Sequence, residues 1–528
     1  MDRRTFLSGL AAVAVATACA DDSSDRSASG SSTSTTLVAA TPAPADLAAG
    51  IFGLGVASGD PLADRVMLWT RLAAAPLTAD GGSPKIDVEV AYDVATDDAF
   101  TNLVASGVVT TTAALAHSVH VDITGLTADT WYHYRFRAGT QSSPTGRTRT
   151  FPEPSAEKSQ LRFVFASCQD HQWGHYGAWA HAAVEPELDA VVFLGDYIYE
   201  TTLPDLSPDG SGARVWASPE PKTLVDYRWR YAQTKADAQL QAAHHAVPWL
   251  TIFDDHEVSN NYAGDVGQAD VTKPLSHDRR LAAYQAWYEH TPIRIDPQPS
   301  SFESLTVNRS LTFGTLATLF GIETRQHADP PPCRTGVELT DDAPGCAERD
   351  DPARSNLGTV QEQWLRDQLS ASTATWNVIA NPLLMAGLNT GTAEAPKYTL
   401  DTWDGYTASR DRLLAHIETT KPSNPVVITG DWHASFVLDV KRTPDAPTLM
   451  PEFLASSMTT IIFGDDYRAN NPHVRYFVGE HGYGLVTITA AQFLCEFKYI
   501  ADVWDPNTAI SHVDGWKVLS GQHEAQPV

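Results

Sequence analysis

Acidic, imidazole, phenol and thiol side chains follow directly on short apolar segments of this sequence. The segments, with the residues after them, read RFVFASCQD, VVFLGDYIYE, WLTIFDDHEV and VVITGDWHAS. The side chains they deliver are Cys168, Asp196, Tyr199, Asp255, His256, Asp431 and His433. Charged groups placed where buried strands end are not needed for packing, and oxygen donors gathered with imidazoles at one sheet edge suit a cluster of metal ions. The pattern therefore predicts a metal-dependent hydrolase.

Each segment taken alone also has a structural interpretation. Asp196 could cap a turn, with Tyr199 in a partly buried wall. Asp431 and His433 are separated by one residue, so an extended backbone would place both on one face, as metal ligands or as a satisfied structural pair. A cysteine that ends a strand, such as Cys168, is usually just buried. Four such segments in one chain favour the functional interpretation.

The segment FDDHEVSNNY is the densest of these groups. It places six hydrogen-bonding side chains within eight positions, at Asp254, Asp255, His256, Glu257, Asn260 and Asn261. Such residues are poor core material, and a helix-start role would explain only one of the aspartates. The segment therefore indicates a functional site.

The composition limits the class of protein. The chain has 528 residues, of which 43% are hydrophobic, and a formal net charge of -27. This length allows a large core and favours two domains. The acidity argues against nucleic acid and anionic membrane surfaces as main partners, because phosphate arrays are held by an excess of Lys and Arg.

Residues 1–45 are predicted to be a targeting signal and tether. Arg3 and Arg4 precede an Ala-rich apolar segment that is too short to span a bilayer as a stable helix, which resembles a twin-arginine export signal. A Ser/Thr-rich stretch, 23–36, follows. Cys19 could be acylated as a lipid anchor, or cleavage nearby could remove it. We expect a periplasmic, extracellular or membrane-tethered protein.

The other cysteines fit an exported protein. Cys333 and Cys346 lie thirteen positions apart in a Pro-rich loop, which favours a disulfide. Cys495 lies in the apolar segment FLCEFKYI and is predicted to be a core residue.

Two folding patterns follow one another along the chain. In 46–155, short alternating segments such as IDVEVAYDV and WYHYRFRAG, separated by Gly, Asp and Pro turns, are typical of an antiparallel β-sandwich, with the aromatics of WYHYRF in its core. In 156–528, apolar segments alternate with helical stretches such as SHDRRLAAYQAWYEH and SRDRLLAHIETT. We predict a layered α/β catalytic domain there.

Motifs in one order along nearly the whole chain resemble the PhoD family of alkaline phosphatases, within the calcineurin-like metallophosphoesterase superfamily. The matching segments are GVASGDPLADRVMLWTR, DITGLTADTWYHYRFRAG, FASCQD, GDYIYE, DDHEVSNNYAG, ETRQ, WNVIANPLLM, WDGY, GDWHASF, NPHVRYF and HGYGLVTIT. The resemblance implies a layered αββα metallophosphoesterase sandwich preceded by a small antiparallel β-sandwich domain of fibronectin III type.

The resemblance also implies the metals and their ligands. Fe(III) would be bound by Cys168, Asp196, Tyr199 and His433, with Asp196 bridging to calcium, of which one or two ions are expected. Asp255 and Asp431 fall where the superfamily places ligands of a second metal. Asp404, in WDGY, is a candidate outer calcium ligand, although an aspartate before Gly405 could equally form a turn.

Catalytic roles are carried over in the same way. His256 corresponds to the histidine that binds phosphate and protonates the leaving group, and one of Asn260 and Asn261 is expected to face the site. Arg325, in ETRQ, could hold a phosphate oxygen, since guanidinium geometry suits that task. Glu323 stands where this segment usually has Asp.

These inferences predict an exported, monomeric phosphatase that hydrolyses small phosphate monoesters, with some diesterase capacity, by attack of a metal-bound hydroxide or oxide. No specific nucleic-acid binding is expected. A phosphodiesterase of phospholipase D type shares the motifs and is the nearest alternative. A surface lipoprotein that only binds is an alternative of another class, but it leaves the acid and imidazole groups beyond Cys168 unexplained.

Overall fold

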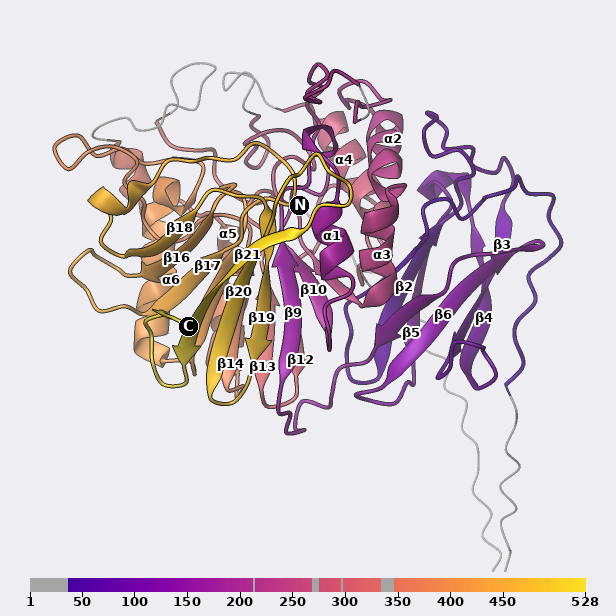
Figure 1. Ribbon diagram of the computed structural model, residues 1–528, viewed down its shortest axis with the longest axis horizontal. Coiled ribbons are helices and arrows are strands. Elements are labelled where there is room, and N and C mark those ends of the chain that lie inside the picture. The colour runs from indigo at the N-terminus through magenta and orange to yellow at the C-terminus, as the bar shows by residue number, and fades with distance from the viewer. Residues whose placement is uncertain (1–36, 212–213, 268–274, 296–297, 334–345) are drawn as a thin grey trace, which may run out of the picture. The chain divides into compact units, whose positions relative to one another are not determined.

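The computed structural model describes residues 37–211, 214–267, 275–295, 298–333 and 346–528, which include one compact unit, 37–528. The predicted twin-arginine signal and Cys19 lie outside these ranges. The described residues form three β-sheets and six α-helices (Figure 1). No helix in these ranges combines the length and the apolar character needed to cross a membrane.

The largest sheet has ten strands and begins in the N-terminal region. Its order is β22-β21-β20-β19-β9-β10-β11-β1-β2-β5. The bounds are β1 (Val56–Gly59), β2 (Arg65–Arg71), β5 (Ser118–Thr124), β9 (Leu161–Ala166), β10 (Ala190–Phe193), β11 (Trp249–Thr251), β19 (Gly482–Ile488), β20 (Gln492–Ile500), β21 (Ile510–Leu519) and β22 (Gln526–Pro527). Strands β9, β10 and β11 are parallel neighbours, so their carboxyl ends share one edge.

A second sheet has seven strands, in the order β12-β13-β14-β15-β17-β16-β18. The bounds are β12 (Arg309–Phe313), β13 (Ala317–Gly321), β14 (Trp376–Asn381), β15 (Pro425–Thr429), β16 (Ser435–Val440), β17 (Met450–Leu454) and β18 (Val474–Val478). Strands β13, β14 and β15 are parallel. Parallel strands need helical crossovers, and helices therefore connect them.

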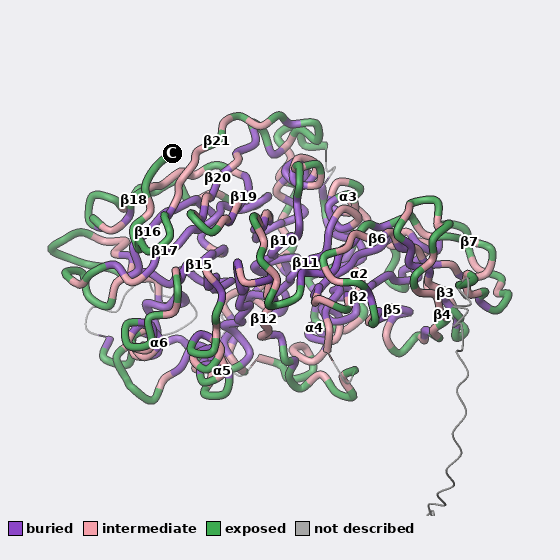
Figure 2. Tube along the Cα trace, turned by 90° about the horizontal axis from the view of Figure 1, so that it is seen from below, coloured by how far each residue is buried: buried purple, intermediate pink, exposed green. Residues whose placement is uncertain are grey.

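Helices cover the outer faces of the two sheets. The bounds are α1 (Gly177–Ala182), α2 (Leu224–Lys235), α3 (Ala238–Ala246), α4 (His277–His290), α5 (Gly358–Ala371) and α6 (Thr407–Thr420). On β14, Trp376 and Val378 belong to the core between the sheets, whereas Ile379 packs with Leu365 of α5 and Leu413 of α6. Figure 2 shows α5 and α6 on the far side of β12 and β15 from β19 and β20. The predicted αββα layering is confirmed.

The N-terminal region contains the predicted antiparallel sheet. Its strands are β3 (Val88–Ala95), β4 (Leu103–Thr111), β6 (Trp131–Ala138), β7 (Gln141–Ser142) and β8 (Gly146–Arg149). Tyr132, Tyr134 and Phe136 of WYHYRF are buried in its core, as predicted, against residues of β1, β2 and β5. Since β1 pairs with β11 through Gly59 and Trp249, the second layer of this sandwich continues into the catalytic sheet.

Two cysteine predictions are confirmed. Cys333 and Cys346 form a disulfide, with Cα atoms 5.8 Å apart. Cys495 is fully buried on β20.

Candidate metal centre

The predicted site residues lie just beyond the carboxyl ends of strands in both sheets. Cys168 follows β9, Asp196 follows β10, Asp255 follows β11, and Asp431 follows β15. The backbone at Cys168, Asp196, Asp431 and His433 is left-handed, with φ between +57° and +67°. Non-glycine residues rarely adopt this conformation, and it concentrates at functional sites. The turns bend sharply so that the side chains face one another.

The glycines of the two GD motifs allow this close approach. A Cβ at Gly195 would lie 2.5 Å from Asp254 Cβ, and one at Gly430 would lie 2.5 Å from Ser167 Oγ. Each glycine therefore lets one ligand-bearing loop pack against another. Glycine thus precedes Asp196 and Asp431 because a larger residue would collide with the neighbouring loop.

The first donor group contains Cys168, Asp196 and His433, whose ligand atoms lie within 4.8 Å of one another. Cys168 Sγ donates to Asp196 Oδ2 at 3.4 Å. Tyr199 Oη donates to the same oxygen at 3.0 Å and lies 3.3 Å from His433 Nε2. A thiol, a phenol, a carboxylate and an imidazole therefore converge from three separate loops.

Two further donor groups extend from the first. Asp196, Asp255 and His256 form one, and Asp254, Asp255 and Asp431 form the other, each with ligand atoms within 4.8 Å. Asp196 belongs to the first two groups and Asp255 to the last two. The geometry thus offers adjacent sites that share carboxylates, which suits neighbouring cations.

The electrostatics of these groups fit bound cations. Burial raises the pKa of Asp254 well above its usual range, and burial with the charge of Asp255 raises the pKa of Asp431 to about 7, although Arg325 acts against both shifts. Asp254 Oδ2 is buried without a hydrogen-bond partner. Burial and Asp196 also raise the pKa of the Cys168 thiol and the Tyr199 phenol. Without added positive charge, these groups hold their protons, and metal ions would reverse that preference.

The two histidines differ in charge. Burial lowers the pKa of His433 to about 3, so its imidazole is neutral and able to bind a metal. Burial acts in the same direction on His256, but Asp255, Glu200 and Asp196 together raise its pKa well above the usual value. His256 Nδ1 lies 2.7 Å from Glu200 Oε2, and its ring stacks on Tyr199. In the metal-free protein, the partly buried His256 imidazole therefore favours its protonated form.

Two glutamates to which the sequence analysis gave no individual role, Glu257 and Glu200, hold the loops of the site together. Glu257 accepts hydrogen bonds from the backbone N–H groups of Asp196 at 3.1 Å, Tyr197 at 2.5 Å and Asp254 at 2.9 Å. Glu200 accepts from Asn260 N at 2.6 Å while it pairs with His256. Both glutamates lie in segments that also carry predicted ligands, Glu200 in GDYIYE and Glu257 in DDHE, and this position was the only indication of their role in the sequence.

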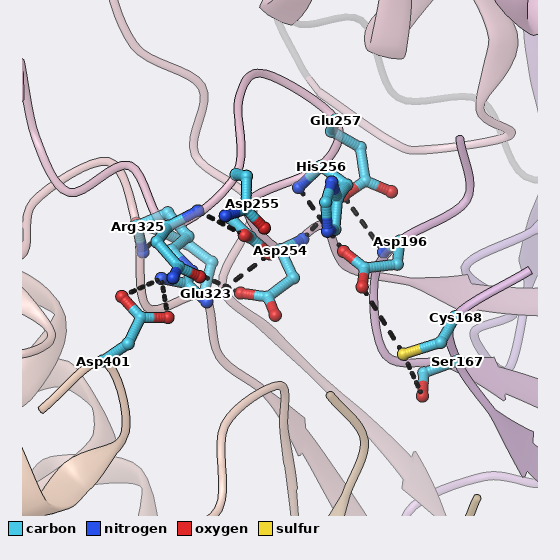
Figure 3. A network of polar contacts seen from close by, with 12 residues as sticks. Ser167, Cys168, Asp196, Asp254, Asp255, His256, Glu257, Glu323, Arg325 and Asp401 are labelled. Atoms are coloured by element: carbon cyan, nitrogen blue, oxygen red, sulfur yellow. Dashed lines mark hydrogen bonds and ion pairs between the residues drawn. The ribbon is translucent and has the colours of Figure 1, made fainter. Parts of the chain in front are cut away.

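Arg325 is placed among carboxylates and is only 1% exposed (Figure 3). Its Nε donates to Asp254 Oδ1, and its Nη1 donates to both oxygens of Asp401 at 3.0 and 2.9 Å. Glu323 accepts from the backbone N–H of Arg325 at 2.9 Å and so fixes the turn. Asp401 was missed in the sequence because no apolar strand precedes it.

Asp404 is not brought together with the other predicted ligands. Its Oδ1 accepts from Arg410 at 2.9 Å, and its Oδ2 accepts from Leu388 N at 2.8 Å. It lies in a short 3₁₀ helix (Trp403–Tyr406), where Thr402 caps the start. The structure therefore favours the alternative of a structural aspartate over that of an outer calcium ligand.

A cavity of about 400 Å³ opens over the donor groups. Asp196, Asp255, Asp431, His256 and His433 line it, as do both Asn260 and Asn261. Cys168, Tyr199 and Arg325 do not belong to its lining. Substrate can therefore reach the donor groups from one side, while the thiol and the phenol lie behind them.

The metal-free protein provides a test of the electrostatics at Asp431. The pKa of Asp431 is about 7 in the folded protein, against about 4 when the chain is unfolded. As the pH rises from about 4 to about 7, ionisation increasingly favours the unfolded state, so the free energy of unfolding falls. Asp431→Asn should therefore gain stability over the wild type between pH 5 and pH 8, by roughly 2 to 4 kcal/mol. Urea unfolding of both proteins in chelator would measure this, and with metals restored the order should reverse. An unchanged difference across this pH range would contradict the assignment.

The comparisons with known proteins agree with this fold and site. The family described as PhoD-like phosphatase matches residues 163–497, and the PhoD-like phosphatase N-terminal domain matches 38–152. Alkaline phosphatase D of Bacillus subtilis (strain 168) is 42% identical over 471 residues, covering 87% of this chain and 79% of that protein. A solved structure titled "Structure of PhoD" has a TM-score of 0.85 at 39% identity and covers 92% of this chain and 93% of its own.

A layered α/β fold with thiol, phenol, carboxylate and imidazole donors at one sheet edge is typical of the class of metal-dependent hydrolases. The chain belongs to the PhoD-like phosphatase family.

Proposed function

We propose that this protein is an exported alkaline phosphatase that hydrolyses small phosphate monoesters and has some diesterase capacity. The observation that carries the proposal is the convergence of Cys168, Asp196, Tyr199 and His433 beside an acidic cavity. The relative named Alkaline phosphatase D supports the same activity.

The metals we propose are Fe(III) and calcium. Cys168, Asp196, Tyr199 and His433 offer the thiolate, carboxylate, phenolate and imidazole donors proposed for Fe(III). Asp255, Asp254 and Asp431 offer the carboxylates suited to calcium. When bound, such cations neutralise phosphoryl oxygens and make hydroxide available near neutral pH.

The protein's own residues complete the chemistry. Glu200 occupies Nδ1 of His256, so Nε2 of the protonated ring can donate its proton to the leaving alkoxide. Asn260 and Asn261 line the same cavity; the Asn260 amide can orient a phosphoryl oxygen, whereas the Asn261 amide donates to the carboxylates of Asp401 and Asp255. Arg325 does not line the cavity and balances the charge of the carboxylates instead.

Export is proposed from the twin-arginine pattern at Arg3 and Arg4. The disulfide between Cys333 and Cys346 supports an oxidising compartment. The monomeric state and the lipid anchor at Cys19 remain predictions.

One purified sample tests the function. We expect hydrolysis of p-nitrophenyl phosphate to exceed that of its bis ester and of phosphatidylcholine, iron and calcium by elemental analysis, and a visible tyrosinate-to-iron band. Chelation should abolish activity. A strong preference for the diesters would instead favour the phosphodiesterase alternative, and full activity in a colourless, metal-free protein would refute the metal assignment.

A further inference from the structure

Aromatic side chains form part of the cavity wall beside the donor groups. Phe463, Trp432 and Tyr467 all line the cavity. The Phe463 ring stacks on His433, with centroids 5.1 Å apart and planes inclined by 18°, and Tyr467 contacts Trp432 edge-on at 6.2 Å. The aromatic surface therefore begins directly next to a predicted metal ligand.

Phe463 is unusual among these residues because it is 45% exposed, whereas Trp432 is 8% exposed. Single exposed apolar residues are common on protein surfaces and need no explanation. Ile461, on the same loop, is such a residue, since it is 44% exposed and does not line the cavity. Phe463 differs because it lines the cavity over the donor groups and stacks on His433.

The other lining residues are polar. They include Thr390, Thr399, Thr402, Asp401 and Asp465. A phosphoryl group at the donor groups would leave its organic substituent in a cavity whose lining includes these three aromatic side chains. Aromatic surfaces bind flat rings well, and base–aromatic stacking is a recurrent source of affinity.

We propose that Phe463, supported by Trp432 and Tyr467, forms a subsite that stacks a ring of the substrate's organic group. This inference rests on the proposed function and specifies its substrate class. The site thereby favours aryl and nucleoside phosphates over acyclic polyol phosphates.

Phe463 could alternatively serve only to hold His433 in place, and the experiment must separate these roles. Phenylphosphonate and methylphosphonate are not hydrolysed as esters, and they differ in whether they carry a ring. Calorimetric binding of both to the metal-loaded full chain therefore reports on ring recognition without turnover. The variants are Phe463→Ala, the conservative Phe463→Tyr and the matched control Ile461→Ala.

We expect Phe463→Ala to weaken phenylphosphonate binding by about tenfold and methylphosphonate binding by less than about twofold, with unchanged metal content. Phe463→Tyr and Ile461→Ala should bind both ligands like the wild type. Equal weakening of both ligands, or loss of iron, would assign Phe463 to the support of His433 and overturn the subsite. No weakening of either ligand would also overturn it.

Kinetics provide a second readout. Adenosine 5′-phosphate and glycerol 1-phosphate both have primary alkoxide leaving groups, but only the first carries rings that can stack on Phe463. Phe463→Ala should therefore lower kcat/KM for adenosine 5′-phosphate about tenfold more than for glycerol 1-phosphate. If the wild type hydrolyses no phosphate ester but still binds phenylphosphonate through Phe463, the proposed function fails and the subsite stands.

Discussion

Replacing Asp196 with Asn is expected to lower activity by more than about a hundredfold and to deplete the bound metal. Asp196 belongs to two donor groups and accepts from both Cys168 and Tyr199, so its carboxylate is the common member of the centre. Loss of an outer partner of a metal ligand already costs 10- to 100-fold, and loss of a shared ligand should cost more. Elemental analysis and p-nitrophenyl phosphate hydrolysis would measure both effects.

Asp404→Asn is the matched control. It also removes one buried carboxylate charge, but Asp404 pairs with Arg410 away from the donor groups. We expect it to keep its metal content while losing some stability. Metal loss in Asp404→Asn comparable to that in Asp196→Asn would restore Asp404 as a ligand. If Asp196→Asn kept full turnover, the proposed centre would be wrong.

Arg325→Ala is expected to destabilise the metal-free protein by about 3 to 5 kcal/mol. The guanidinium is buried between Asp254 and Asp401 and lies 3.5 Å from Asp255. Removal of this cation leaves the buried carboxylates of Asp255 and Asp401 without their positive partner, which typically costs this much. Urea unfolding in chelator would measure the loss.

The matched control is Arg442→Ala. Arg442 also pairs with two carboxylates, Asp411 and Glu418, but those side chains are 52% exposed. Exposed pairs contribute little to stability because solvent screens them, so this variant should be nearly as stable as the wild type. If Arg325→Ala instead unfolded like the wild type and only raised KM for phosphate esters, the phosphate-holding role predicted from the sequence would be correct.

The sequence predicted the donor groups because each one follows a buried strand. Strands in the middle of a sheet are continuous apolar segments, so the polar residue after each segment is visible in the sequence. Cys168, Asp196, Asp431 and His433 were found in this way. Their roles as ligands remain predictions that the observed geometry supports.

Asp401 and Glu257 could not be identified in the same way. Asp401 lies in a loop without a preceding strand, and its importance comes from Arg325, which is 76 positions away. Glu257 is buried because it joins two loops through their backbone N–H groups. Contacts between distant segments leave no pattern in the neighbouring sequence. For the same reason, the sequence could not show that Asp404 lies apart from the donor groups.

The sequence by itself determined the two folding patterns, the apolar strands and the residue types at their ends, since periodicity and chain order are local properties. Only the tertiary structure decided that the N-terminal strands extend the catalytic sheet, that Arg325 lies among carboxylates, and that Phe463 faces the cavity. These features depend on which distant segments pack together, and packing is settled by the whole core.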